Sequence, residues 1–200
     1  MKHYDRSYFD KWYRDSRTRM WSRVAVERKV RMVLGVAEFL LDRRVRSVLD
    51  VGCGEGSWYP ILRRMRPHLR YQGVDSSVYA VRRFGALRNI RLGSLAELGS
   101  LRLRGPFDLV VCCDVLHYVP TAELRHGLRV LKRLAGGPMY LEAYTTADDI
   151  AGDDVDFQRR GAATYRRLFR EAGLVACGMH IYCPARMRDQ LVALEMVGDR

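Results

Sequence analysis

Three glycines between an apolar stretch and a helix-like segment carry the clearest chemical signal in this 200-residue sequence. Gly52, Gly54 and Gly56 lie in the run VLDVGCGEG, after the apolar residues 45–51 and before a segment that begins at Ser57. Glycine has no Cβ, so the backbone here can adopt a positive φ and approach a ligand closely. The N-terminus of the following helix offers unpaired N–H groups and the positive end of a dipole. This order predicts a strand, a tight turn and a helix that together bind a nucleoside-containing ligand.

An acidic residue stands at the distance that ribose recognition requires. Asp75 follows Gly56 by 19 positions, at the end of a second strand-like stretch over residues 71–74, and Ser76 comes next. A carboxylate at that offset can accept hydrogen bonds from both hydroxyls of a ribose. Ser57 stands where a dinucleotide-binding loop would have its third glycine. A nicotinamide-dependent enzyme with an altered third glycine, or a glycine turn in another doubly wound domain, remains an open alternative.

The run DVGCGEG over residues 50–56, followed by the acid at Asp75, resembles the first two motifs of the class I S-adenosylmethionine-dependent methyltransferases. The resemblance extends over residues 45–195 and implies methyl transfer with S-adenosylmethionine as the cofactor. It places Ser94 and Leu95 at the adenine, where most members have Asp or Asn near Ser94, and Asp114 beside the methionine end of the ligand. Asp50 and Asp114 could instead cap the loops that hold them. The cofactor-binding residues implied are Asp50, Gly52, Cys53, Gly54, Gly56, Asp75, Ser76, Ser94, Leu95 and Asp114.

Two residues after the predicted fourth strand are candidates for catalysis. His117 lies in the run CCDVLHYV and has the pKa range of a general base, and Tyr118 follows it. Methyl transfer mainly requires that the acceptor be held close to the sulfonium carbon and aligned with it, so a base is needed only where the acceptor must lose a proton. His117 could instead be a packing or hydrogen-bonding residue, and packing is the alternative for Tyr118.

The N-terminal 15 residues are rich in aromatic side chains, including Tyr8, Trp12 and Tyr13 at helical spacing. An aromatic segment before the first strand resembles the lid that covers the active site of many small-molecule methyltransferases. On this resemblance the substrate-contacting residues are Tyr8, Trp12, Tyr13 and, at the end of the fifth strand, Tyr144. A helix packed against the edge of the sheet is the alternative.

Charge bears on the acceptor in two opposite ways. The net charge of +12 is a possible sign of nucleic-acid binding, but the arginines are spread in pairs over predicted helices, and no nucleic-acid motif accompanies them. Five aspartates within residues 148–156 form an acidic loop that is either solvated or attractive to a cationic acceptor. We expect a small-molecule acceptor. The alternatives are an RNA or DNA methyltransferase and a non-catalytic S-adenosylmethionine-binding protein.

Composition and cysteine placement favour a soluble chain in a reducing compartment. No apolar run approaches the length needed to span a bilayer, and residues 1–15 lack the apolar core of a signal peptide. We therefore expect a cytoplasmic monomer or homodimer. Cys112 and Cys113 must point to opposite faces of a strand, and His180 is out of phase with Cys177 and Cys183, so thiols are favoured over a metal site.

Alternating strand-like and helix-like segments predict a single domain with a three-layer α/β/α sandwich. Residues 1–44 supply the aromatic segment and one long amphipathic helix, and residues 45–200 supply a doubly wound, mostly parallel seven-stranded sheet. The family resemblance implies that this sheet closes with an antiparallel hairpin, for which we expect strands near residues 174–182 and 190–196. Ligands of such sheets bind beyond the carboxyl ends of the strands, at the switch point.

Overall fold

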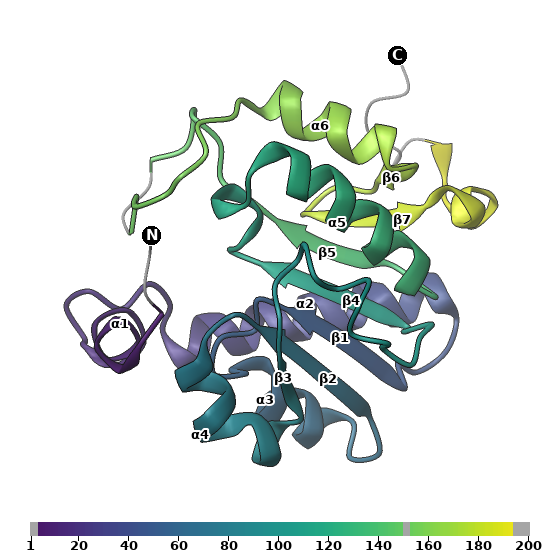
Figure 1. Ribbon diagram of the computed structural model, residues 1–200. Helices are drawn as coiled ribbons and strands as arrows, with labels where there is room; N and C mark the ends of the chain where they lie inside the picture. Colours follow the sequence, from purple (N-terminus) through teal and green to yellow (C-terminus); the bar gives the residue numbers. More distant parts are fainter. Residues whose placement is uncertain (1–3, 150–152, 194–200) are drawn as a thin grey trace.

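A seven-stranded sheet forms the centre of the computed structural model, which describes residues 4–149 and 153–193 (Figure 1). The strand order is β3-β2-β1-β4-β5-β7-β6. The strands are β1 (Ser47–Val51), β2 (Arg70–Asp75), β3 (Ile90–Leu92), β4 (Leu109–Cys113), β5 (Met139–Glu142), β6 (Leu174–Ala176) and β7 (Ile181–Pro184). The pairs among β1 to β5 are parallel, whereas β7 is antiparallel to both β5 and β6. This confirms the predicted mostly parallel sheet with a closing antiparallel hairpin.

The helices precede β1, connect successive strands or follow β7, and in the described residues none lies between β3 and β4 or between β6 and β7. They are α1 (Arg6–Phe9), a π-helical turn (Asp10–Arg14), α2 (Arg23–Leu41), α3 (Trp58–Met65), α4 (Val78–Arg88), a 3₁₀ turn (Leu116–Tyr118), α5 (Thr121–Leu134), α6 (Ala162–Glu171) and a second 3₁₀ turn (Ala185–Gln190). In the part of the chain that the structure describes, no helix combines the length and apolar character that crossing a bilayer needs.

Strand periodicity divides the core between the two faces of the sheet. Alternate residues of β4 point in opposite directions: Val110 and Cys112 pack with α5 and α6, while Leu109 and Val111 pack with α2 and α3. Figure 1 shows α5 and α6 on one side of the sheet and α2 and α3 on the other. Because both faces are covered, the central strands are continuously apolar. The predicted three layers are confirmed.

The positions predicted for the closing strands are wrong. Residues 174–182 do not form one strand, because Gly178, Met179 and His180 all have positive φ and reverse the chain between β6 and β7. The second strand predicted near residues 190–196 lies too late in the sequence. Residues 185–190 form a 3₁₀ turn instead, and residues 194–196 lie outside the described chain. A short apolar run does not show where a turn divides it.

Candidate functional site

The glycine loop after β1 adopts a conformation that only glycine accommodates easily. The φ angles of Gly52, Gly54 and Gly56 are +71°, +55° and +74°. A Cβ at Gly52 would overlap the Val115 side chain, and one at Gly54 would lie 2.5 Å from the Tyr13 hydroxyl oxygen. The loop is therefore packed between the segment after β4 and the N-terminal aromatic residues.

Asp75 lies at the carboxyl end of β2 and faces this loop. Its Oδ2 accepts a hydrogen bond from the Gly54 N–H at 2.6 Å, and its Oδ1 accepts one from the Ser77 N–H at 2.8 Å. Burial raises the pKa of Asp75 even though both hydrogen bonds favour the carboxylate. Each carboxylate oxygen retains acceptor capacity, so Asp75 can still bind two further hydroxyl groups.

Asp50, the last acid before the glycine loop, is the most deeply buried carboxyl at this edge of the sheet. It is 3% exposed, and its Oδ2 accepts a hydrogen bond from the Tyr71 hydroxyl at 2.7 Å. Burial raises the pKa of Asp50 to about 7, while the hydrogen bond from Tyr71 opposes this increase. Asp50 therefore titrates near neutral pH directly beneath the loop.

A cavity of about 730 Å³ joins the glycine loop to the ends of β2 and β4, the N-terminal segment and the first turns of α2 and α3. The residues of its lining that the sequence predicted for a site are Asp50, Gly52, Cys53, Gly54, Asp75, Ser76, Asp114, Tyr118, Tyr8, Trp12 and Tyr13. Positions far apart in the sequence thus meet at one surface. The cavity lies at the carboxyl edge of the parallel strands, where doubly wound sheets bind ligands.

The N-terminal segment packs against the glycine loop and lines the cavity beside it. Phe9 is 1% exposed and its ring stacks on Tyr79, with centroids 5.6 Å apart. The Tyr4 carbonyl accepts a hydrogen bond from the Ser77 hydroxyl at 2.6 Å, and Arg14 forms an ion pair with Glu55 of the loop. The segment therefore bridges the ends of β1 and β2.

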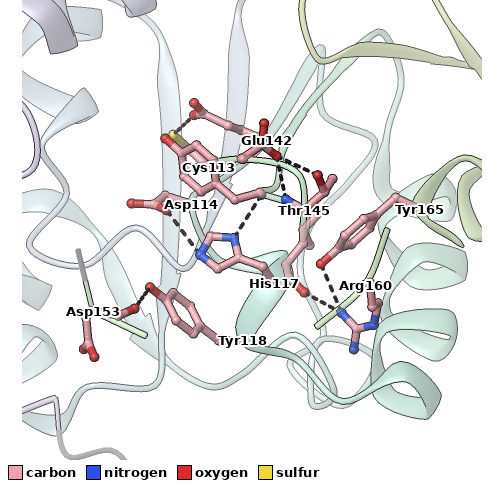
Figure 2. Close-up of polar contacts among 12 residues, drawn as sticks. Cys113, Asp114, His117, Tyr118, Glu142, Thr145, Asp153, Arg160 and Tyr165 are labelled. Atoms are coloured by element: carbon pink, nitrogen blue, oxygen red, sulfur yellow. Dashed lines mark hydrogen bonds and ion pairs between the residues drawn. The ribbon is translucent and has the colours of Figure 1, made fainter. Parts of the chain in front are cut away.

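A buried histidine supports Asp114 on the other side of the cavity (Figure 2). His117 is fully buried, and its Nδ1 accepts a hydrogen bond from the Tyr144 N–H at 3.4 Å. A neutral His117 therefore has its proton on Nε2, which lies 3.4 Å from Asp114 Oδ1. Asp114 has a φ of +61° and lines the cavity, so the carboxylate faces the ligand space while the imidazole lies behind it.

Comparison with known proteins agrees with this geometry. Residues 49–136 match the family model described as a methyltransferase domain. The chain is similar in structure to an O-methyltransferase family protein from Burkholderia thailandensis (19% identity, TM-score 0.54, covering 80% of this chain and 56% of that one). It also resembles the S-adenosylmethionine-bound aminopentose methyltransferase from Micromonospora echinaspora (16% identity, TM-score 0.63, covering 84% and 94%). A third neighbour is the magnesium protoporphyrin IX methyltransferase of Synechocystis with bound S-adenosylhomocysteine (21% identity, TM-score 0.57, covering 86% and 87%).

Residues 49–136 match a methyltransferase domain, and the chain has the fold of the class I S-adenosylmethionine-dependent methyltransferases. The predicted family, fold and cofactor are confirmed. No curated protein sequence matches the chain at a significant level. The chain spans just over half of the Burkholderia protein, although it spans most of the other two neighbours.

The residues of the methyltransferase cavity fit the cofactor. Gly52 and Gly54 line the cavity without side chains of their own, so the loop presents main chain to the cavity beside Val115 and Tyr13. Asp75 offers carboxylate oxygens at the cavity wall, as a ribose requires, and Asp50 and Asp114 add acidic groups suited to a sulfonium or an ammonium.

The other predicted residues of the methyltransferase lie outside the cavity lining as described. Gly56 faces Ile90 and Arg88. The Ser94 N–H and hydroxyl both donate to the Glu97 carboxylate, at 2.8 and 2.9 Å, and the Leu95 side chain is in the core. His117 is buried behind Asp114, and the Tyr144 ring packs edge-on against His117 with centroids 5.3 Å apart. The functional roles assigned to these residues from the sequence stay predictions.

A buried arginine that sequence reasoning missed fastens the loop after β5 to the segment after β4 (Figure 2). Arg160 is 6% exposed and donates hydrogen bonds to the carbonyls of Leu116 and Val119, the Thr121 hydroxyl and the Tyr165 hydroxyl. The Tyr118 hydroxyl donates to the Asp153 carbonyl at 2.7 Å in the same contact region. In the sequence Arg160 follows Arg159, and a basic pair in a loop shows no sign that one member is buried.

A second missed cluster joins α2 to the ends of β4 and β5. Lys29 forms an ion pair with Glu142, with Nζ and Oε2 2.6 Å apart, and the Cys113 thiol donates to the same carboxylate at 2.7 Å. Burial disfavours the Lys29 ammonium, but the neighbouring Glu142 carboxylate outweighs this effect and raises the pKa of Lys29. Burial likewise raises the pKa of the Cys113 thiol well above its usual range. The cluster therefore holds an ammonium, a carboxylate and a neutral thiol beside the cavity.

Proposed function

We propose that this methyltransferase transfers its methyl group to a small-molecule acceptor. The observation that carries the proposal is the set of aromatic residues in the cavity lining. Tyr8, Trp12 and Trp21 line the same cavity as the glycine loop and Asp75. A volume of about 730 Å³ lies within the range of small-molecule sites. A pocket of this size suits the cofactor together with a compact acceptor.

The residues in and behind the cavity have different roles in the proposed reaction. The glycine loop and Asp75 hold the cofactor, which supplies an activated methyl group on a sulfonium when bound. Asp114 lines the cavity and can accept a proton from an acceptor that must lose one. His117 Nε2 lies 3.4 Å from Asp114 Oδ1 and packs behind this carboxylate, so we assign the histidine a positioning role. The Tyr118 ring lies against His117, with centroids 4.2 Å apart, and closes this side of the site.

The structural neighbours support a small acceptor. Two of them are named for methylating an aminopentose and magnesium protoporphyrin IX. Nucleic acid is the second candidate acceptor, because the chain has a net charge of +12. A duplex would have to reach the glycine loop past the N-terminal segment, which lines the same cavity, and this disfavours a duplex.

Transfer of a labelled methyl group tests the proposal. The protein is incubated with a fractionated extract of small molecules, RNA and DNA, together with S-adenosylmethionine that carries a labelled methyl group. We expect label in the small-molecule fraction only. The matched control is the Asp75→Ala variant, which should leave every fraction unlabelled. Label in RNA or DNA would contradict the proposal and support the second candidate.

A further inference from the structure

The cavity lining contains charges of both signs. Asp50, Asp75 and Asp114 come from the strand ends. Residues 19–29 and α3 contribute one acid, Glu27, and four basic residues that form a basic wall, namely Arg19, Arg23, Lys29 and Arg64. The acids of the strand ends suit the cationic sulfonium of the methyl donor, which leaves the basic wall to meet another ligand.

The ion pairs on the basic wall do not neutralise it. Arg64 pairs with Glu27 at 2.9 Å, and Glu27 also pairs with Arg31 at 2.8 Å. Lys29 is neutralised by Glu142. Within the described chain, neither Arg19 nor Arg23 has a carboxylate within ion-pair distance. The methyl donor has one carboxylate of its own, so the wall retains positive charge even if one arginine binds it.

An aromatic surface lies within the same wall. The Lys29 ammonium is 3.9 Å from the centroid of the Trp21 ring, which holds that ring in place by a cation–π contact. Trp21 is 38% exposed and lines the cavity together with Met20 and Trp58. A flat apolar ring can therefore lie here, next to the arginines.

We propose that the acceptor of this methyltransferase is a flat small molecule with a carboxylate or similar anionic group, which Arg19, Arg23 and Arg64 bind while its ring lies against Trp21. The proposal rests on the small-molecule function and adds the chemical class of the acceptor.

The acidic loop over residues 148–156 is the feature that could instead attract a cationic acceptor. Two of its carboxylates accept hydrogen bonds from residues close to them in the sequence. The Asp148 carboxylate accepts hydrogen bonds from the Thr145 N–H and hydroxyl, at 2.7 and 2.8 Å, and the Asp153 carboxylate accepts one from the Val155 N–H at 3.1 Å. The cavity lining as described includes no aspartate of this loop. Burial, Asp75 and then Asp153 and Asp156 of this loop raise the pKa of Tyr4, which lines the cavity. The charged side chains of the lining itself, away from the strand ends, are mainly basic.

Three probes with one ring test the charge preference. Naphthalene-2-carboxylate, naphthalene-2-carboxamide and 2-naphthylmethylammonium are titrated by calorimetry into the protein saturated with S-adenosylhomocysteine. We expect the carboxylate to bind about tenfold more tightly than the amide, because charge-assisted hydrogen bonds are the stronger ones. In Arg19→Gln, Arg23→Gln and Arg64→Gln this preference should fall severalfold. In Arg28→Gln, an exposed position on α2 outside the cavity lining, it should stay.

Several results would overturn the proposal. They are equal or tighter binding of the amide or the ammonium, no measurable binding of any probe, or arginine variants that lose S-adenosylhomocysteine affinity and keep the probe preference. The last result would assign the arginines to the cofactor.

Anion exchange of the labelled small-molecule fraction distinguishes failure of the proposed acceptor class from failure of the proposed function. Retained label supports an anionic acceptor. Label in the flow-through rejects the anionic group and keeps the small-molecule function, and label in nucleic acid rejects both.

Discussion

Asp50 carries a proton at a pH where an ordinary carboxyl has lost it, because β1 buries it beneath the glycine loop. Burial raises its folded pKa to about 7 from 3.8. Since the folded pKa is the higher one, the stability that this group contributes is fully present below the unfolded pKa and is lost as the pH rises through the folded one. The acid at the start of the family motif therefore lowers the stability of the fold at neutral and alkaline pH.

We predict that Asp50→Asn is more stable than the original chain at high pH. Asparagine cannot ionise and can still accept the hydrogen bond from Tyr71. The difference in the free energy of unfolding should be small near pH 4 and rise to a plateau above about pH 7, by at most about 4 kcal/mol. Urea unfolding of both proteins across this range measures it. A difference that does not change with pH would show that Asp50 ionises normally.

Gly54 is the residue where the cofactor site and the N-terminal segment meet. A Cβ there would lie 2.5 Å from the Tyr13 hydroxyl oxygen, at a φ of +55°. We predict that Gly54→Val abolishes S-adenosylhomocysteine binding, because the side chain fits neither the backbone angle nor the space. The control is Gly35→Ala in α2, where a Cβ meets nothing within 4 Å. It should bind normally and gain roughly 0.5–1 kcal/mol of stability. Calorimetry that finds normal binding by the Gly54→Val variant would contradict the assigned loop.

At the scale of elements, the loop between β5 and α6 is held by one buried side chain. Replacing Arg160 with Met keeps the length of the side chain and removes the donors to the Leu116 and Val119 carbonyls. We predict a loss of about 2–4 kcal/mol in the free energy of unfolding, because buried carbonyls are left unsatisfied. The exposed neighbour in Arg159→Met should change stability by less than about 0.5 kcal/mol. Equal stability of the two variants would show that the contacts of Arg160 contribute nothing.

The N-terminal segment is the second element with a testable role. Deleting residues 1–15 removes the buried Phe9 ring and the Arg14–Glu55 ion pair. We expect the deletion to leave the sheet intact by circular dichroism and to abolish methyl transfer, since closure excludes water and completes the site. A segment that serves only in packing would give the opposite pair of results: a lower melting temperature and unchanged activity of the folded fraction.

The sequence predicts those strands and helices that are marked by residues within them or directly beside them in the chain. β1 and β2 lie at the stretches predicted over residues 45–51 and 71–74, because apolar residues and the flanking glycine turn mark them. The closing hairpin was misplaced, since a turn with positive φ at Met179 and His180 has no distinct signature. Arg160 was missed for another reason: its partners come from residues 116–121 and α6, and only tertiary structure brings them together.

At the scale of the whole molecule, the position of each arginine says more about ligand binding than the net charge does. The net charge of +12 gives no indication of which arginines matter. Arg43 pairs with Asp108 and Arg66 with Glu38 just beyond the C-terminal ends of α2 and α3, outside the cavity lining as described. Arg64 belongs to a similar pair in the sequence, yet it lines the cavity. The cofactor motif could be predicted because its spacing is local, whereas the basic wall forms only when α2 and α3 pack together.

Affinity for S-adenosylhomocysteine in the Asp75→Ala variant tests the central claim most directly, because Asp75 joins the glycine loop to the cavity. Isothermal titration is carried out on the original chain, on Asp75→Ala and on Asp149→Ala, an exposed control. We predict at least a tenfold loss in Asp75→Ala, since two charge-assisted hydrogen bonds are worth on the order of 1.5–3 kcal/mol. The control should bind as the original chain does. Unchanged affinity in a folded Asp75→Ala protein would contradict the claim that this cavity binds the cofactor.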